Sequence, residues 1–372
     1  MKAAVLGIGK MGEAICFAMK KLGFFVVGLD SYEGAAYNFR KHIEGQEGAF
    51  YLTDQNNADK MMETVLLNHE RPDVVISSLP YHQTEEIAHW CIANEFRYCD
   101  LGGRVDVSLS INKEAKEKAT KPVFTDLGVA PGWVNILAEE GCRKLYGAAD
   151  DVKMMVGGLP DYSESTNNPL RYAVTWSVDG LINEYRDDCL ILEDGEIKTV
   201  RGMDGVENIE GENFGPMEAF YTSGGASHSI YDMQRRAVKN CSYKTIRYRG
   251  HGDVVKFLIR DCNLDDETLK KIFLEGCGVV NKDEVFIVAE VSGGDKTWRQ
   301  EKVIKSDERF SAMQKATAFP ISSVASLMAE GSLEGDMEQH RDYYIQYPSD
   351  LSYDNISFDK FNKKLDILFS DE

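Results

Sequence analysis

The 372-residue sequence lacks the cysteine patterns that hold a structural metal or a disulfide framework. Its eight cysteines are scattered, with no C-x-x-C pair and no cysteine–histidine cluster at ligand spacing. Such usage is typical of reduced thiols and predicts no metal site. Apolar runs approaching the ~20 residues of a membrane span are also missing, and the chain enters a strand with no signal peptide. We therefore expect a cytoplasmic protein without a metal or a membrane span.

An excess of basic residues is missing too. The 42 lysines and arginines stand against 61 aspartates and glutamates, which gives a net charge of −19. Nucleic acids and anionic membranes need a basic surface, so the charge argues against both as partners. The acidic field mildly favours a cationic small molecule. The length predicts two domains, because single cores stop growing near ~250–300 residues.

A glycine turn near the start of the chain predicts a dinucleotide site. The apolar run 3–6 enters a G-x-G-x-x-G pattern, and a helical pattern leaves it. In this context the glycines permit a tight turn and a close approach of the pyrophosphate, which lies at the helix N-terminus. The residues expected to bind the cofactor here are Gly7, Ile8, Gly9, Lys10, Met11 and Gly12.

Asp30 ends the second apolar strand, where a carboxylate accepts the ribose hydroxyls of the cofactor. The Asp30 carboxylate repels a 2′-phosphate, and no arginine follows before Arg40 to offset this repulsion. NAD is therefore favoured over NADP. The alternative for Asp30 is a helix N-cap. Further strands at 49–52, 72–78, 97–100 and 122–126 alternate with helices, and this pattern predicts a doubly wound parallel sheet. Cofactor contacts are also expected at the strand ends, from Asp54, Ser78, Leu79 and Pro80.

After residue 126 the pattern changes to an α+β domain with a mainly antiparallel sheet. Strands are predicted at 152–156, 172–176, 243–248, 254–259, 285–291 and 298–303, and Asp194-Gly195 predicts a hairpin. A helix returns at 310–331, with a break expected at Pro320. The expected domains are thus a Rossmann NAD-binding domain (1–126, with the return helix), a catalytic, substrate and dimerisation domain (127–309) and an acidic C-terminal appendage (332–372).

Several motifs resemble the saccharopine dehydrogenase-like family. They are the glycine turn, the two Asp-Leu-Gly segments at 100–103 and 126–132, and the segments at 157–160, 168–170 with 176–177, 214–220, 222–225 and 244–251. The last three point towards the lysine 6-dehydrogenase branch. The resemblance implies a catalytic domain inserted between parts of the nucleotide domain, with the active site in the cleft between them. It also implies NAD-linked removal of the ε-amino group of L-lysine, giving a semialdehyde that cyclises, and a homodimer.

Candidate catalytic residues follow from this chemistry. Oxidation of an amine carbon needs a base, and Asp100 and Asp126 end adjacent strands of the predicted sheet. Either can anchor the amine or act as the base, and the alternative for each is a helix or turn cap. Tyr81, next to His82, is expected to orient the substrate. His251 is a candidate proton carrier, with a satisfied structural histidine as the equal alternative.

The carboxylate of the substrate needs a cationic side chain. For any single arginine or lysine the alternative is an ordinary solvated side chain on the surface. Substrate contacts are expected from Arg171, Tyr172, Thr222, Ser223, Gly224, Lys244 and Arg247. Two rival functions remain open: a saccharopine or carboxy(nor)spermidine dehydrogenase of the same family, and a non-catalytic NAD-binding sensor. Only one arginine lies in the loop 159–171, which favours the smaller substrate.

Overall fold

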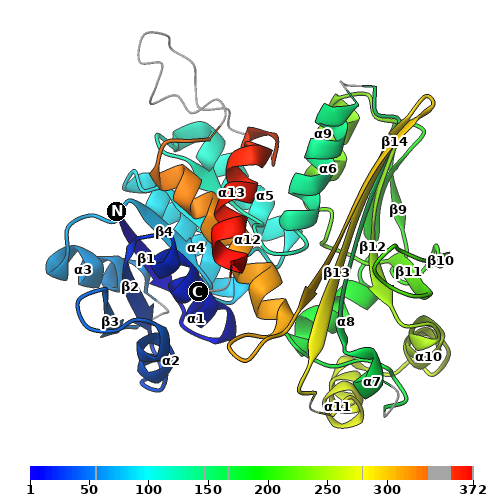
Figure 1. Ribbon diagram of the computed structural model, residues 1–372, viewed down its shortest axis with the longest axis horizontal. Helices are drawn as coiled ribbons and strands as arrows, with labels where there is room; N and C mark the ends of the chain where they lie inside the picture. The colour runs from blue at the N-terminus through cyan, green and yellow to red at the C-terminus, as the bar shows by residue number, and fades with distance from the viewer. Residues whose placement is uncertain (55–56, 146–147, 166–167, 279, 334–352, 371–372) are drawn as a thin grey trace. The chain divides into compact units, whose positions relative to one another are not determined.

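The computed structural model describes residues 1–54, 57–145, 148–165, 168–278, 280–333 and 353–370 (Figure 1). The chain divides into two compact units. Unit 1 comprises Met1–Trp133 and Thr317–Glu372, and unit 2 comprises Val134–Ala316. Unit 1 is therefore built from both ends of the chain, and unit 2 is a continuous segment inserted between them.

Unit 1 contains a six-stranded sheet of order β3-β2-β1-β4-β5-β6 in which all neighbouring strands are parallel. Every residue of 3–6 is fully buried, because helices cover both faces of the sheet. The predicted doubly wound fold is thus confirmed. The strands are β1 (Lys2–Leu6), β2 (Phe25–Asp30), β3 (Gly48–Leu52), β4 (Val74–Ser77), β5 (Tyr98–Asp100) and β6 (Val123–Phe124). The helices between them are α1 (Lys10–Lys21), α2 (Ala35–His42), α3 (Ala58–Asn68), α4 (Tyr81–Ala93) and α5 (Val105–Lys118).

The C-terminal part of unit 1 contains most of α12 (Ala312–Ala329), which starts at the end of unit 2, the short 3₁₀ helix η3 (Tyr353–Asn355) and α13 (Phe358–Phe369). The expected break at Pro320 is wrong, because α12 continues through the proline. Proline removes one helical hydrogen bond, but its neighbours Phe319 and Ile321 are buried, and their packing offsets the loss. Much of the predicted acidic appendage lies outside the described residues, and the rest is an ordered part of unit 1.

Unit 2 is organised around a mixed sheet whose main path is β10-β11-β12-β7-β13-β14, with the β8–β9 hairpin attached to β12. Among the described strands of this sheet only β12 and β7 pair in parallel, so the predicted mainly antiparallel sheet is confirmed. The strands are β7 (Asp151–Pro160), β8 (Cys189–Glu193), β9 (Glu196–Val200), β10 (Glu207–Ile209), β11 (Met217–Tyr221), β12 (Asn240–Arg247), β13 (Asp283–Gly293) and β14 (Lys296–Lys305). The helices are α6 (Trp133–Lys144), α7 (Tyr162–Ser165), α8 (Val178–Arg186), α9 (Ser229–Arg235), α10 (His251–Lys256), the π-helix η1 (Phe257–Asp261) and α11 (Asp266–Gly276).

Two predicted strands of unit 2 are wrong. Residues 172–176 form a loop, because the Asn168 side chain bonds both the N–H and the carbonyl of Tyr172 and so replaces strand pairing. Residues 254–259 are helical. The carboxylate of Glu218 accepts hydrogen bonds from the N–H groups of Gly250 and Gly252, and so provides acceptors for backbone donors at the start of α10. Both structures depend on side chains that lie outside the segment itself.

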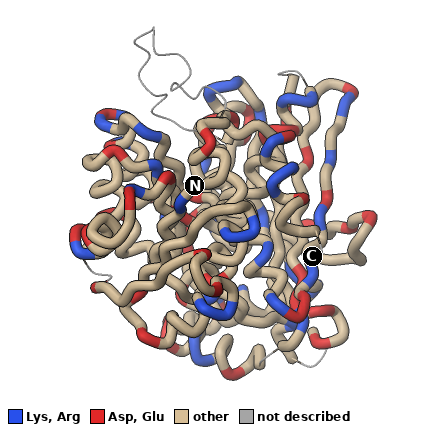
Figure 2. The backbone as a smooth tube through the Cα atoms, turned by 60° about the vertical axis from the view of Figure 1, so that its left-hand side comes forward, with Lys and Arg blue, Asp and Glu red and all other residues tan. Residues whose placement is uncertain are grey.

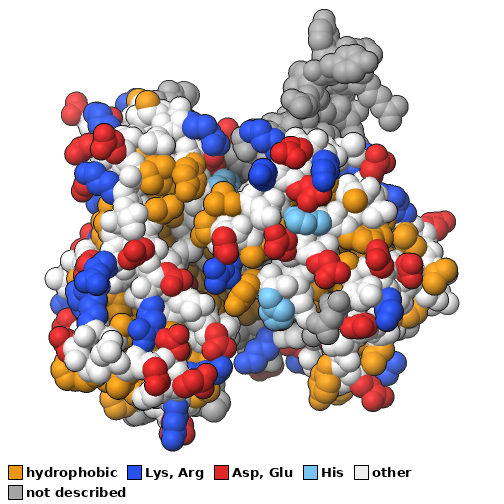
Figure 3. Space-filling view, turned by 180° about the vertical axis from the view of Figure 1, so that it is seen from behind, with side chains coloured by type: hydrophobic (Ala, Val, Ile, Leu, Met, Phe, Trp, Pro, Cys, Tyr) orange, Lys and Arg blue, Asp and Glu red, His pale blue; other side chains and the backbone are white. Residues whose placement is uncertain are grey.

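Acidic and basic residues are interspersed along both units (Figure 2). On the face drawn in Figure 3, the basic side chains of the described residues stand among acidic ones. The net charge of −19 is therefore spread over the chain. None of the described helices is both long and apolar enough to cross a membrane.

Candidate active site

The turn between β1 and α1 leaves open space above its backbone. Gly7 has φ +84°, and a Cβ on Gly12 would lie 1.8 Å from the Gly7 carbonyl oxygen. A Cβ on Gly9, the N-cap of α1, would meet nothing within 4 Å. The first N–H groups of α1 are thus accessible to an anion, and Lys10 is exposed beside them. These residues fit the pyrophosphate of a dinucleotide, and Gly7, Gly9 and Gly12 would hold it by permitting its close approach.

Asp30, at the end of β2, is hydrogen-bonded to this turn. Its Oδ2 accepts the Ile8 N–H at 2.6 Å, and its Oδ1 accepts the Tyr32 N–H at 2.8 Å. Each carboxylate oxygen has two lone pairs, so acceptor capacity remains for ribose hydroxyls. Asp54, expected near the adenine, is exposed after β3 and lies 3.9 Å from Lys60.

The loop after β4 packs beside the glycine turn. A Cβ on Gly7 would lie 3.0 Å from both the Ser78 carbonyl oxygen and the Leu79 side chain. Ser78 is half-buried and Pro80 is exposed, at the end of the sheet where ligands of open α/β folds bind. Tyr81 is the first residue of α4 and is 40% exposed, with the Arg104 guanidinium 5.8 Å from its ring. The structure thus brings the predicted cofactor loop and Tyr81 to one edge.

Asp100 and Asp126 meet at the ends of β5 and β6. One oxygen of Asp100, Oδ1, accepts the N–H of Gly102 at 2.8 Å and that of Asp126 at 3.2 Å. The second oxygen, Oδ2, is buried and has no hydrogen-bond partner within the described residues. Asp126 Oδ1 accepts the Ser108 hydroxyl at 2.7 Å. The two aspartates that the sequence singled out therefore form a pair of buried carboxylates.

Burial, together with the neighbouring Asp126 carboxylate, raises the pKa of Asp100 to about 7, against the lowering effect of the hydrogen bonds from the two backbone N–H groups. A carboxylate with this pKa takes up and releases a proton near neutral pH. Groups with such a shift cluster at functional sites. Asp100 thus has the properties of a general base.

Arg247 is the centre of a second polar cluster, in unit 2. Its buried guanidinium donates from Nε to the Tyr185 hydroxyl at 2.8 Å and lies 4.7 Å from the centre of the Tyr172 ring. Its Nη1 donates to the Ile246 carbonyl, and its Nη2 lies 3.9 Å from Glu184 Oε2. The Nη2 group makes no hydrogen bond within the described residues, so a buried cation keeps donors for a ligand carboxylate.

Glu184 is a site candidate that the sequence did not reveal. It is on α8, its side chain is 21% exposed, and the described chain gives its carboxylate no hydrogen bond. Burial raises its pKa to about 7, against the effect of Arg247. The Ser177 N-cap and the apolar spacing of Leu181 and Ile182 could have located α8, but nothing in the sequence places Glu184 beside Arg247.

His251 does not fit the role of a proton carrier. Its Nδ1 bonds the Leu170 carbonyl at 2.7 Å, and its Nε2 bonds the Tyr185 hydroxyl at 3.0 Å. The ring is 1% exposed, and burial together with Arg247 lowers its pKa to about 3. A neutral ring with both nitrogens bonded supports the alternative of a structural histidine.

The remaining predicted substrate residues differ in how far their polar groups are already engaged by other protein groups. Lys244 already has protein partners, because its ammonium donates to Glu207 at 2.5 Å and to the Gly205 carbonyl at 2.6 Å, which argues against a ligand role. Thr222 is buried and its hydroxyl bonds that of Thr245 at 2.8 Å. The loop that follows Thr222 is open at Gly224, where a Cβ would meet nothing within 4 Å. Its neighbour Ser223 bonds the carbonyl of Asn183 on α8, and Arg171 lies 5.2 Å from the Tyr248 ring. Among the described residues there is no cluster of side chains suited to hold a metal.

The glycine turn, the strand order and the strand-end carboxylates define a dinucleotide-binding protein of the doubly wound class. The chain belongs to the saccharopine dehydrogenase family. Residues 3–127 match the model of the saccharopine dehydrogenase NADP binding domain, and residues 128–341 match that of the saccharopine dehydrogenase C-terminal domain. The family suggested by the sequence motifs is therefore confirmed.

Similar proteins include the saccharopine dehydrogenase (NADP(+), L-glutamate-forming) of Schizosaccharomyces pombe, 25% identical over 220 residues, which cover 58% of this chain and 48% of that protein. The mitochondrial alpha-aminoadipic semialdehyde synthase of Bos taurus is 24% identical over 61% of this chain and 23% of its own length. The matches thus span about half or less of these relatives. Apo saccharopine dehydrogenase (L-Glu forming) from Saccharomyces cerevisiae shares the fold, with a TM-score of 0.71 and 15% identity over 99% of this chain and 97% of that chain.

The raised pKa of Asp100 predicts a pH-dependent effect of the substitution Asp100→Asn. Since the folded pKa of about 7 exceeds the value of ~3.9 for an unfolded aspartate, this group stabilises the fold at low pH and loses that contribution as the pH rises through 7. Asparagine keeps the Oδ1 acceptor without the charge. We expect a clearly higher thermal midpoint than the wild type at pH 8 and a smaller gain at pH 5, measured by circular dichroism.

The matched control is Asp106→Asn, because the exposed Asp106 carboxylate has its pKa lowered by a hydrogen bond from Arg104. This variant is expected to give no gain in thermal midpoint at pH 8. A gain for Asp100→Asn that is equal at both pH values would show that Asp100 does not titrate in this range.

Proposed function

We propose that the chain is an NAD-dependent oxidoreductase that removes the ε-amino group of L-lysine. The balanced reaction converts lysine, NAD⁺ and water into the semialdehyde, ammonium, NADH and one proton, and the semialdehyde then cyclises. Membership of the saccharopine dehydrogenase family supports an oxidoreductase that acts on a C–N bond of an amino acid. The proposal includes a cytoplasmic homodimer.

The observation that carries the proposal is the Asp100–Asp126 pair. Hydride leaves an amine carbon only when the nitrogen has a free lone pair, so a base must first take a proton from the ammonium. Asp100 Oδ2 has an open acceptor and a pKa of about 7, which fits this task. The nicotinamide of NAD, when bound, accepts the hydride. Once that proton has passed to the solvent, Asp100 can deprotonate the water that attacks the iminium carbon, and Tyr81 is proposed to orient the substrate.

The amino-acid head of lysine carries one carboxylate and one ammonium, and unit 2 offers one group for each. Arg247 keeps Nη2 donors for the carboxylate, and Glu184 keeps acceptors for the ammonium. The Tyr172 ring lies against the guanidinium and limits its movement. The backbone of Ser223 and Gly224 and the side chain of Arg171 remain proposed contacts for the same carboxylate.

NAD is proposed rather than NADP because of the residues around the ribose position. In this proposal the carboxylate of Asp30 lies beside the ribose, and Glu33 follows it in the sequence, so negative charge opposes a 2′-phosphate. The relatives whose names specify NADP(+) would then differ from this chain in the cofactor that they use. A second candidate function is saccharopine oxidation, which the names of those relatives favour. That reaction also breaks a C–N bond but needs cations for two further carboxylates.

An amine panel tests the reaction. We expect NADH absorbance on addition of L-lysine with NAD, and none with saccharopine, ornithine or carboxyspermidine. Cadaverine is the matched substrate control, because it has the same terminal amine but no carboxylate for Arg247, and we expect a much higher KM. Turnover of saccharopine alone would support the second candidate, and no turnover of any amine would favour a non-catalytic NAD-binding protein.

The substitution Asp30→Asn tests the cofactor. Asparagine keeps one of the two backbone hydrogen bonds and removes the charge, so the preference for NAD over NADP should fall by about tenfold, roughly 1.4 kcal/mol. The measurement is the dissociation constant of each cofactor by calorimetry. Glu63→Gln, which removes an exposed charge from α3, is the control and should leave the preference unchanged. A wild type that already prefers NADP would contradict the role of Asp30.

A further inference from the structure

Asp126 has a backbone conformation that needs support. Its φ is +64°, in the left-handed region that residues other than glycine rarely adopt. Hydrogen bonds restrain it: its N–H donates to Asp100, its Oδ1 accepts from the Ser108 hydroxyl, and its carbonyl accepts from the Tyr353 hydroxyl at 2.8 Å. Strained residues of this kind persist only where the surroundings determine them. Asp100 and Ser108 belong to the nucleotide-binding sheet and its helices, whereas Tyr353 comes from the end of the chain.

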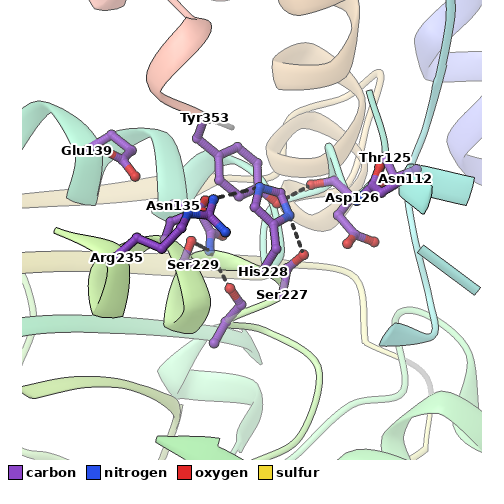
Figure 4. A network of polar contacts seen from close by, with 12 residues as sticks. Asn112, Thr125, Asp126, Asn135, Glu139, Ser227, His228, Ser229, Arg235 and Tyr353 are labelled. Carbon is purple, nitrogen blue, oxygen red and sulfur yellow. Dashed lines mark hydrogen bonds and ion pairs between the residues drawn. The ribbon is translucent and has the colours of Figure 1, made fainter. Parts of the chain in front are cut away.

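Tyr353 is well placed to restrain Asp126. It is 0% exposed, and its ring lies 5.9 Å from the ring of Phe124, the last residue of β6. Figure 4 shows the tyrosine pointing its hydroxyl at the strand end that carries Asp126. A phenol has few rotatable bonds, so a packed ring holds its hydroxyl in one position.

The segment that carries Tyr353 is itself anchored to unit 1. Phe361, Leu365 and Leu368 of α13 are buried, and the Phe369 ring lies 4.9 Å from that of Phe319 on α12. Two polar contacts anchor it further. Lys364 pairs with Glu330 at 2.5 Å, and Lys21 of α1 donates to the Ser370 carbonyl at 2.7 Å. The position of Tyr353 is therefore determined by a helix that packs on the body of unit 1.

We propose that Tyr353 is a positioning residue that holds Asp126, and through it the Asp100–Asp126 pair, in the geometry that amine oxidation requires. The proposal rests on the proposed function, in which this pair is the reacting centre. It assigns a role to the C-terminal segment, which reaches the strand end without contributing a reacting group. Displacement of a reacting group by an ångström costs on the order of 10²-fold in rate, so loss of one restraint should be measurable.

The test is Tyr353→Phe, which removes one oxygen and keeps the packed ring. With lysine as substrate we expect kcat to fall by about tenfold or more. The KM for NAD should change by less than about twofold, because Tyr353 bonds Asp126, whereas the cofactor is proposed to bind at the glycine turn and Asp30. The pH profile of kcat should also shift, because the Asp126 carboxylate contributes to the raised pKa of Asp100. A purely structural role for the hydroxyl would leave this profile unchanged.

The matched control is Tyr51→Phe. Tyr51 is on β3, at the opposite edge of the same sheet, and its hydroxyl bonds His69 at 2.9 Å. This variant also loses one hydroxyl hydrogen bond, and its kcat should equal that of the wild type. A Tyr353→Phe enzyme with unchanged kcat and pH profile would overturn the proposal.

Hydrogen–deuterium exchange separates this proposal from the proposed function. The Leu127 N–H donates to the Asp100 carbonyl at 2.9 Å, so its exchange reports how firmly the strand end is held. In Tyr353→Phe we expect faster exchange of Leu127 and not of the β1 amides, whether or not the wild type oxidises lysine. If the wild type is inactive with every amine, the proposed function fails, and unchanged exchange would then overturn the positioning role as well.

Discussion

The structure of the candidate site depends on one acceptor, the Oδ1 atom of Asp100. It accepts backbone N–H groups from Gly102 and Asp126, so it joins the end of β5 to the end of β6. This junction requires glycine at position 102, where a Cβ would lie 2.1 Å from Asp126 Oδ1. It also places Asp126 in a left-handed backbone conformation, and the described residues offer the buried Asp100 Oδ2 no hydrogen bond. The raised pKa of Asp100 follows from the same arrangement, because burial and a second carboxylate both oppose its charge.

The nucleotide-binding unit could be predicted from the sequence because the patterns that determine it lie within short stretches of the chain. A glycine pattern between two apolar strands has few other structural solutions, and alternating strands and helices determine a parallel sheet. Asp30, Asp100 and Asp126 could be placed at strand ends for the same reason. The family could be predicted as well, since its motifs lie along most of the chain.

The features that the sequence could not predict depend on side chains from other parts of the chain. Residues 172–176 have the composition of a strand, but the Asn168 side chain occupies the backbone groups that a strand would use. Helix α10 begins where it does because Glu218, more than thirty positions earlier, caps it. Lys244 and Arg247 are equally cationic in the sequence, and only the structure shows that Lys244 is paired with Glu207. Tyr353 reaches Asp126 from the other end of the chain.

The central claim is that hydride leaves the ε-carbon of lysine. The direct measurement uses lysine deuterated at that carbon and follows the label by mass spectrometry of the reduced cofactor. The account predicts NADH that carries one deuterium, formed together with ammonium. Unlabelled NADH from this substrate, or labelled NADH from lysine deuterated only at the α-carbon, would contradict it.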